Sequence, residues 1–127
     1  MAQRVVGGGE RWVATRIVGL SGVTTASIQV PQGCDLARIQ PQLLTNSNDC
    51  ILIGRGGTKA SPTLPTVALN ELQLFSGDVD ADCFPAGEII SFRIVTPAGV
   101  DVVGGASDRI SVAFYTNIAG RAQKVVG

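Results

Sequence analysis

The sequence has no histidine and few aromatic residues: one Trp, one Tyr and four Phe among 127 residues. Without histidine it lacks the commonest general base and metal ligand, which excludes His-based triads and Cys–His dyads. A pair of carboxylates could still hydrolyse a glycoside, but sugar sites usually present aromatic platforms. We therefore expect no catalytic centre, no cofactor and no small-molecule substrate.

Long apolar runs are also absent. No stretch approaches the ~18 consecutive apolar residues of a membrane-spanning helix, and no charged-then-apolar signal segment opens the chain. We therefore expect no contact with a membrane. The three cysteines, Cys34, Cys50 and Cys83, show no CxxC spacing. They are predicted to be free thiols in a reducing compartment, buried as small apolar side chains, with one disulfide and a spare thiol as the alternative.

Alternating apolar and polar residues dominate what is present. Segments 88–96 and 109–118 have the period-2 pattern of half-buried antiparallel strands, with Ser91 and Arg93 expected on the outer face. Further strands are predicted at 11–20, 25–30, 36–44, 50–54 and 100–103, while 67–75 is predicted as a strand although it could also line one face of a helix. The expected core side chains are Ile90, Phe92, Ile94, Ile110, Val112, Phe114 and Ile118.

Turn signals separate these segments. Pro-x-Gly occurs at 31, 85 and 97, where Pro suits the second position of a type I turn and Gly the fourth. Seven or eight short strands in a single domain predict an all-β fold, an antiparallel β-sandwich or jelly-roll-like domain over 11–118. An extended N-terminal arm, 1–10, and a C-terminal tail, 119–127, flank it.

Three glycine-rich stretches do not fit such a compact domain: 1–10, 54–66 and 119–127. Loops of this length are usually disordered or functional. "GRGGTK" (54–59) matches no phosphate-binding motif, and the overall neutrality disfavours a nucleic-acid partner. Valines in a glycine-rich arm can add as a short strand to a neighbour's edge. The predicted interface residues are Arg4, Val5, Val6, Arg55, Lys59, Arg121, Lys124, Val125 and Val126.

Charge is segregated along the chain although the net charge is zero: residues 1–60 carry +3, residues 61–108 carry −6 and the last nineteen carry +3. Copies could attract one another head to tail, unless the fold interleaves these segments. Asp78, Asp80 and Asp82 begin like a calcium loop, but Cys83 stands where the sixth position needs Gly and Ile89 where the twelfth needs Glu. We expect no tightly bound metal; these aspartates form a solvated or arginine-paired face, with a weak calcium site as the alternative.

Glycine-rich ends, turns such as "FPAGEIISFRI", few charges and no histidine make the chain resemble the β-sandwich structural proteins of tailed bacteriophages, such as capsid decoration (cement) proteins. The resemblance implies a non-enzymatic virion protein, assembled in the host cytoplasm, that binds the major capsid protein and its own copies. A head–tail connector or tail subunit of the same virion is an alternative. A soluble carbohydrate- or ligand-binding β-sandwich module is an alternative of another class.

Overall fold

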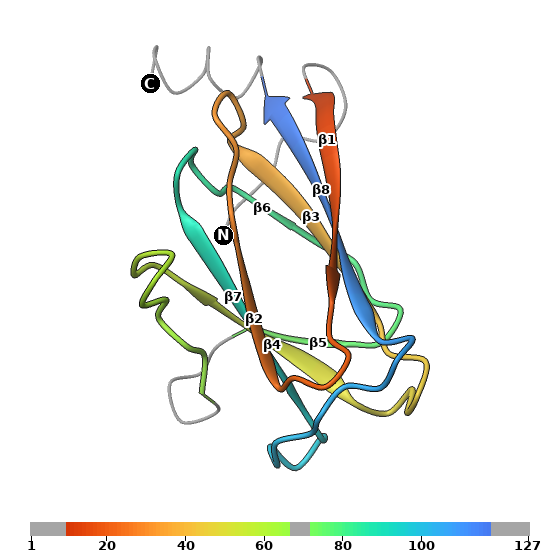
Figure 1. The fold of residues 1–127 in the computed structure, drawn as a ribbon. Coiled ribbons are helices and arrows are strands. Elements are labelled where there is room, and N and C mark those ends of the chain that lie inside the picture. Colours follow the sequence, from red (N-terminus) through yellow and green to blue (C-terminus); the bar gives the residue numbers. More distant parts are fainter. Residues whose placement is uncertain (1–9, 67–71, 118–127) are drawn as a thin grey trace.

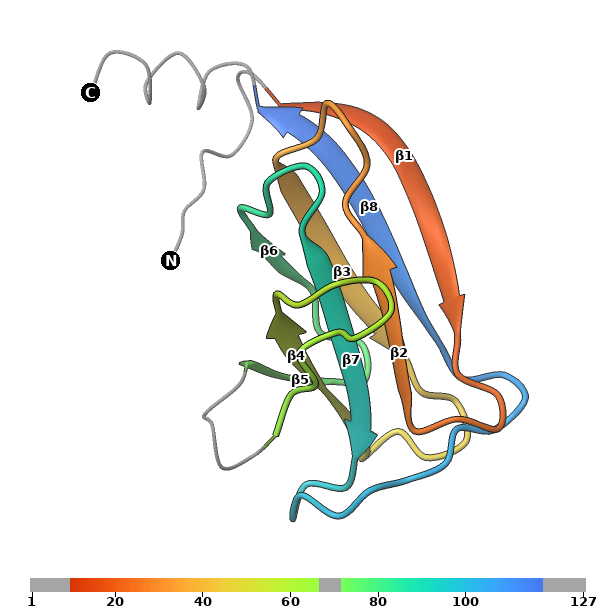
Figure 2. The same cartoon turned by 60° about the vertical axis from the view of Figure 1, so that its left-hand side comes forward.

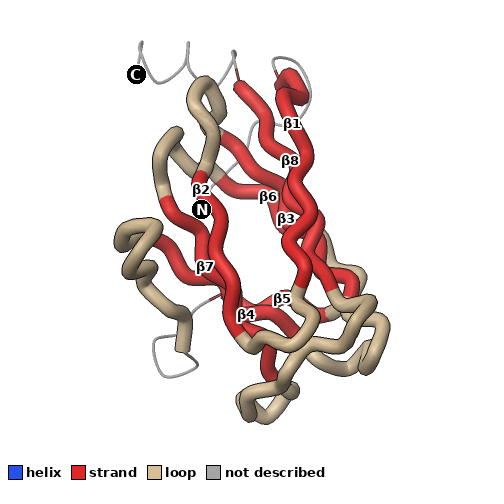
Figure 3. The backbone as a smooth tube through the Cα atoms, in the orientation of Figure 1, coloured by secondary structure: helices blue, strands red, loops and turns tan. Residues whose placement is uncertain are grey.

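The computed structural model of the chain describes residues 10–66 and 72–117. Within these residues it contains eight strands and no helix (Figure 3), which confirms the predicted all-β class. None of these residues belongs to a helix long and apolar enough to cross a membrane. The strands are β1 (Glu10–Gly19), β2 (Thr25–Gln29), β3 (Leu36–Gln42), β4 (Cys50–Arg55), β5 (Leu72–Phe75), β6 (Asp80–Asp82), β7 (Ile89–Val95) and β8 (Arg109–Asn117).

The strands form two four-stranded sheets with the orders β1-β8-β3-β6 and β2-β7-β4-β5. Every neighbouring pair is antiparallel. The first four strands therefore pair with the last four in reverse order, as in one long hairpin that has been folded over. In Figures 1 and 2 the sheets face each other, with the edge strands β1 and β2 on one side and β5 and β6 on the other.

The core lies between the two sheets. The residues predicted to be buried on β7 and β8 are fully inaccessible and pack in one cluster with side chains of β3 and β4 such as Ile39 and Ile51. This confirms the predicted core, except for Ile118, which lies outside the described residues. The confirmed residues are Ile90, Phe92, Ile94, Ile110, Val112 and Phe114.

Strand β7 is not half-buried as its alternating pattern predicted, because Ser91 on its outer face is also buried. The loop that follows β4 packs over this face. Gly54, which lies opposite Ser91 in the ladder, is so close to the loop that an added Cβ would lie 2.9 Å from the Thr63 carbonyl oxygen. The expectation that residues 54–66 do not fit a compact domain is therefore wrong for this loop.

The structure corrects two further elements. Residues 100–103 form no strand; Asp101 makes only an isolated bridge to Val95. A short strand that was not predicted, β6, lies within the aspartate segment. Pro97 and Gly99 occupy the second and fourth turn positions as predicted, since the Gly99 N–H donates to the Thr96 carbonyl at 2.8 Å. In the turns at Pro31 and Pro85, however, the carbonyl of the Pro itself accepts the hydrogen bond from the N–H three residues later. Pro is therefore the first residue of these turns and Gly the third, which differs from the predicted second and fourth positions.

Candidate interaction surface

Strand β1 is the most exposed strand of the described chain. It pairs only with β8, so its other edge has no strand beside it among the described residues. None of residues 11–19 is buried, and Trp12 and Ile17 are 59% and 60% exposed. A long edge strand with apolar side chains and unpaired backbone groups is a template for pairing with another chain.

A bulge between Trp12 and Ala14 shifts the register of β1 against β8. This shift determines which side chains of β1 lie on the inner face of the sheet. Beyond the bulge Arg16 lies opposite the buried Val112, so it is on the inner face of the sheet. Trp12 lies opposite Tyr115 at the start of the strand, and its indole N–H donates to the Thr15 hydroxyl at 3.0 Å. Arg16 thus places a charge on the face of the sheet that elsewhere covers the core.

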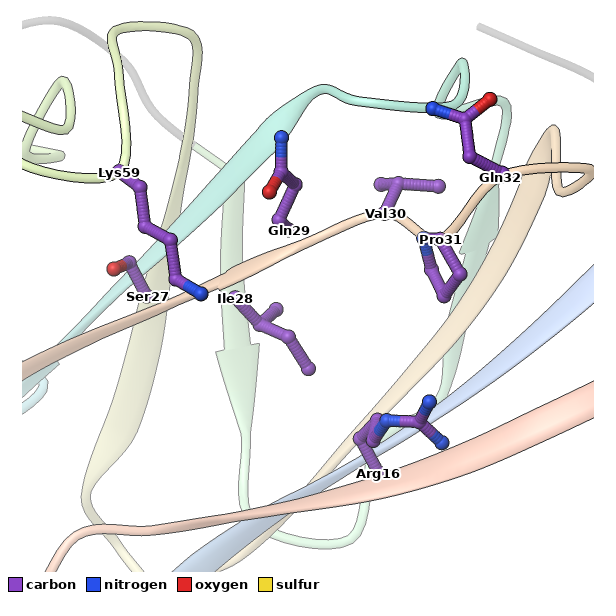
Figure 4. A pocket seen from close by; sticks show the side chains of 8 residues that line it. All are labelled: Arg16, Ser27, Ile28, Gln29, Val30, Pro31, Gln32 and Lys59. Atoms are coloured by element: carbon purple, nitrogen blue, oxygen red, sulfur yellow. The ribbon is translucent and has the colours of Figure 1, made fainter.

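Arg16 lines a cleft of about 430 Å³ at the side of the molecule where the edges β1 and β2 come together (Figure 4). Ile28, Val30 and Pro31 supply its apolar surface. Lys59 reaches the cleft from the β4–β5 loop. Two cations from different elements therefore flank an apolar surface; we call this side, with Arg11, Arg16 and Lys59, the basic edge.

Asp78, Asp80 and Asp82 lie at the opposite side, on the edge strand β6 and the turn before it. Asp80 and Asp82 face the buried Ile39 and Ala37 of β3, so both are on the inner face of the sheet. Asp78 lies in the turn instead and accepts a hydrogen bond from the Phe75 N–H at 3.1 Å. No group of three or more acidic, cysteine or histidine side chains that could hold a metal ion occurs among residues 10–66 and 72–117.

Exposed apolar side chains accompany the aspartates. Leu72, Phe75 and Val79 are 45%, 44% and 55% exposed. Leu72 and Phe75 belong to β5, the edge of the second sheet, which pairs only with β4 among the described strands. We call this side, with these apolar residues and the three aspartates, the acidic edge.

Arg55, a predicted interface residue, is engaged within the chain. Its guanidinium donates to both Glu88 carboxylate oxygens, at 2.7 and 3.1 Å, and lies 3.3 Å from Asp82. It also lies over the Phe84 ring, 4.2 Å from the centroid. The hydrogen bond to Glu88 outweighs the opposing effect of burial and raises the pKa of Arg55. Asp82 is thus paired with an arginine, as the sequence suggested for the aspartates.

The remaining predicted interface residues divide into two groups. Lys59 is exposed and lines the cleft. The others, together with any arm they form, lie outside the described residues: Arg4, Val5, Val6, Arg121, Lys124, Val125 and Val126.

At one end of the molecule Asp108 joins two loops. Its carboxylate accepts the N–H groups of Thr45, in the β3–β4 loop, and Gly105, in the β7–β8 loop, at 2.9 and 2.8 Å. Burial of Asp108 opposes its ionisation, but these hydrogen bonds prevail and lower its pKa. Asp49 is also buried, and its burial together with the Asp108 charge raises the pKa of Asp49. The joined loops expose aliphatic side chains at Leu44, Val100 and Val103.

The cysteines are free thiols, as predicted, and the alternative of one disulfide is wrong. Cys34 and Cys50 are buried, whereas Cys83 is half-buried. Burial raises the pKa of Cys50, although a hydrogen bond from Gln73 to its sulfur opposes the shift. This thiol therefore stays protonated at neutral pH and acts as a small apolar side chain.

Comparison with protein-family models, with curated proteins and with solved structures finds no match to this chain. Sequence reasoning did not find the basic edge at Arg16, because an arginine in an alternating strand is normally assigned to the solvent face. The bulge before Ala14 changes which residues face inward, and no residue in the sequence marks it.

Proposed function

We propose that the protein is a structural subunit of a virus particle, without catalytic activity, that binds a capsid surface and its own copies. The first support is the fold. We take the orders β1-β8-β3-β6 and β2-β7-β4-β5 as those of an eight-stranded jelly roll made of two Greek keys, and this assignment is part of the proposal. Such jelly rolls occur in viral capsid and lectin domains and in cupins. Because one fold serves many functions, the choice between these functions has to be argued from the surface of the protein.

The observation that carries the proposal is the exposed edge strand β1. Its apolar side chains lie on a strand edge and not inside a pocket, which suits contact with another protein chain more than capture of a small molecule. The exposed Leu44, Val100 and Val103 at the loop end supply a second apolar surface that can contact a capsid. The arms would add further strand contacts to neighbours.

A head–tail connector or tail subunit of the same virion is consistent with the same features. Immunogold electron microscopy tests the proposal and separates these roles. Antibodies raised against the purified protein are applied to virus particles from the organism that carries the gene. Labelling over the whole head supports a decoration protein, whereas labelling at one vertex or along a tail supports the connector or tail alternative. Absence of the protein from purified particles, checked by mass spectrometry, would contradict the virion proposal.

A carbohydrate- or ligand-binding module is the second candidate, and the cleft at the basic edge favours it. Its volume of about 430 Å³ is within the usual range of ligand pockets. However, the exposed Trp12 does not line it, and Trp12 is held by Thr15. A glycan array discriminates: saturable binding of a defined glycan that Arg16→Ala abolishes would favour this candidate.

A further inference from the structure

The two open sides of the molecule carry opposite charges and both expose apolar groups. The basic edge has Arg16 and Lys59 around the apolar surface of the cleft and the exposed Arg11 further along β1. The acidic edge has three aspartates, of which Asp82 is paired with Arg55 of the same chain, together with the exposed Leu72, Phe75 and Val79. From this complementarity we propose that the basic edge of one copy binds the acidic edge of the next, so that the copies associate head to tail. The inference rests on the proposed function, in which the protein binds its own copies.

The strand directions fit this arrangement. Each sheet has four strands and every neighbouring pair is antiparallel, so the two edge strands of a sheet run in opposite directions. When two copies stand side by side in the same orientation, β1 of one therefore meets β6 of the other antiparallel. The same holds for β2 and β5 in the second sheet. Because β1 and β2 lie on one side of the molecule and β5 and β6 on the other (Figure 2), both sheets can continue across a single contact.

The side chains that meet across the contact are also matched. Arg16 and Asp80 both lie on the inner face of the first sheet, at its opposite edges. In a continuous sheet these residues would lie on the same face, where opposite charges on adjoining strands attract. Among the described residues Arg16 makes only a long hydrogen bond, 3.4 Å, to the Thr15 carbonyl, so its charge has no acidic partner there.

Such a contact is heterologous, because it joins two different surfaces of the same chain. A heterologous contact generates a closed ring if its rotation closes and an open filament if it does not. Because β6 has only three residues and β5 four, few main-chain hydrogen bonds form across the contact. The charges and apolar side chains must therefore supply much of the specificity.

An inward charge on an edge strand can instead serve to prevent edge-to-edge pairing. The two roles predict opposite effects of changing Arg16. If Arg16 pairs with the acidic edge, Arg16→Glu weakens association by about tenfold or more, because like charges then meet. If Arg16 blocks pairing, Arg16→Ala increases association.

Sedimentation velocity over a wide range of protein concentration, at low and high salt, tests the proposal. We expect the wild-type chain to associate, and salt to weaken that association. Arg16→Glu and Asp80→Arg should each reduce it, and an equimolar mixture of the two variants should restore it, since the introduced glutamate then faces the introduced arginine. Arg109→Glu is the matched control; it makes the same charge change on the central strand β8, and we expect it to have little effect.

A wild-type chain that stays monomeric throughout overturns the proposal, as does increased association of Arg16→Ala. Equal weakening by Arg16→Glu and Arg109→Glu, or a mixture that does not restore association, also overturns it. Circular dichroism of each variant shows whether it is folded. If Asp80→Arg does not fold, the difference in association between Arg16→Glu and its control Arg109→Glu decides whether the proposal holds. The two proposals can fail separately. If sedimentation overturns the head-to-tail contact but purified virus particles contain the protein, the proposed function still holds.

Discussion

Phe92 and Phe114 lie on facing sheets, and both are completely buried in the common core. Replacing either by Ala removes a large apolar side chain and leaves a cavity, so we expect the free energy of unfolding to fall by about 3 to 5 kcal/mol. Chemical denaturation measures it. Phe75→Ala is the matched control, because Phe75 is 44% exposed and its truncation should cost much less. Equal losses for all three variants would contradict the burial described.

The buried pair Asp49 and Asp108 makes stability depend on pH. Asp108 has a lowered pKa in the folded state, so its contribution is present above the unfolded value, about 3.9, and is lost as the pH falls through its folded pKa. Asp49 has a raised pKa, so its ionised form costs stability at neutral pH, and this cost disappears as the pH falls below its unfolded value.

We therefore expect the two asparagine variants to act in opposite directions at pH 7. Asp108→Asn weakens the hydrogen bonds from Thr45 and Gly105 and should lower the free energy of unfolding by about 1 to 3 kcal/mol. Asp49→Asn should raise it, with a difference from wild type that shrinks toward pH 3. Thermal melts across pH provide the measurement. A destabilising Asp49→Asn at neutral pH would show that the Asp49 carboxylate has a stabilising partner.

At the scale of elements, the β7–β8 loop is held against the turn after β1. The Gly104 carbonyl accepts a hydrogen bond from the Gly22 N–H, and the Gly104 N–H donates one to the Val23 carbonyl, each at 2.9 Å. A Cβ on Gly104 would overlap the carbonyl oxygen of Leu20. We expect Gly104→Ala to lower the free energy of unfolding by about 1 to 3 kcal/mol, because the two segments would have to separate.

Gly19→Ala is the control for this prediction, since an added Cβ there meets no atom within 4 Å. Its melting temperature should equal that of the wild type or exceed it slightly. If Gly104→Ala melts at the same temperature as Gly19→Ala, the loop is not held against the turn in solution.

The elements that the sequence predicted well are those whose pattern is set by the core. Alternation predicted β7 and β8 because one face of each packs on the other sheet. It did not predict β6, because Asp80 and Asp82 lie at an edge where no apolar face is required. It also did not show that Ser91 is buried, since the covering loop comes from a distant part of the chain. The charge complementarity of the two edges likewise depends on strand order, which local patterns do not determine.

At the scale of the whole molecule, the buried core residues that the structure describes lie between Leu20 and Phe114. We expect deletion of residues 1–9 to leave the melting temperature nearly unchanged while abolishing oligomerisation or capsid binding. Calorimetry and light scattering measure the two effects. Unfolding of the truncated chain would place the segment in the core, and normal association would show that assembly does not need it.

The reverse pairing of the two halves of the chain also has a kinetic consequence. Arg11 pairs with Thr116, whereas Cys50 pairs with Phe75, so the contacts range from fairly local to nearly the full length of the chain. Closing such long loops is entropically costly before the contacts form, and folds dominated by distant pairings fold in about milliseconds to seconds. We expect refolding, followed by stopped-flow fluorescence of Trp12, to take place on that timescale. Refolding within microseconds would be the contrary result. On the ribosome β1 is made before the other described strands and β8 after them, so the apolar side chains of β1 remain open to other chains until β8 has been made.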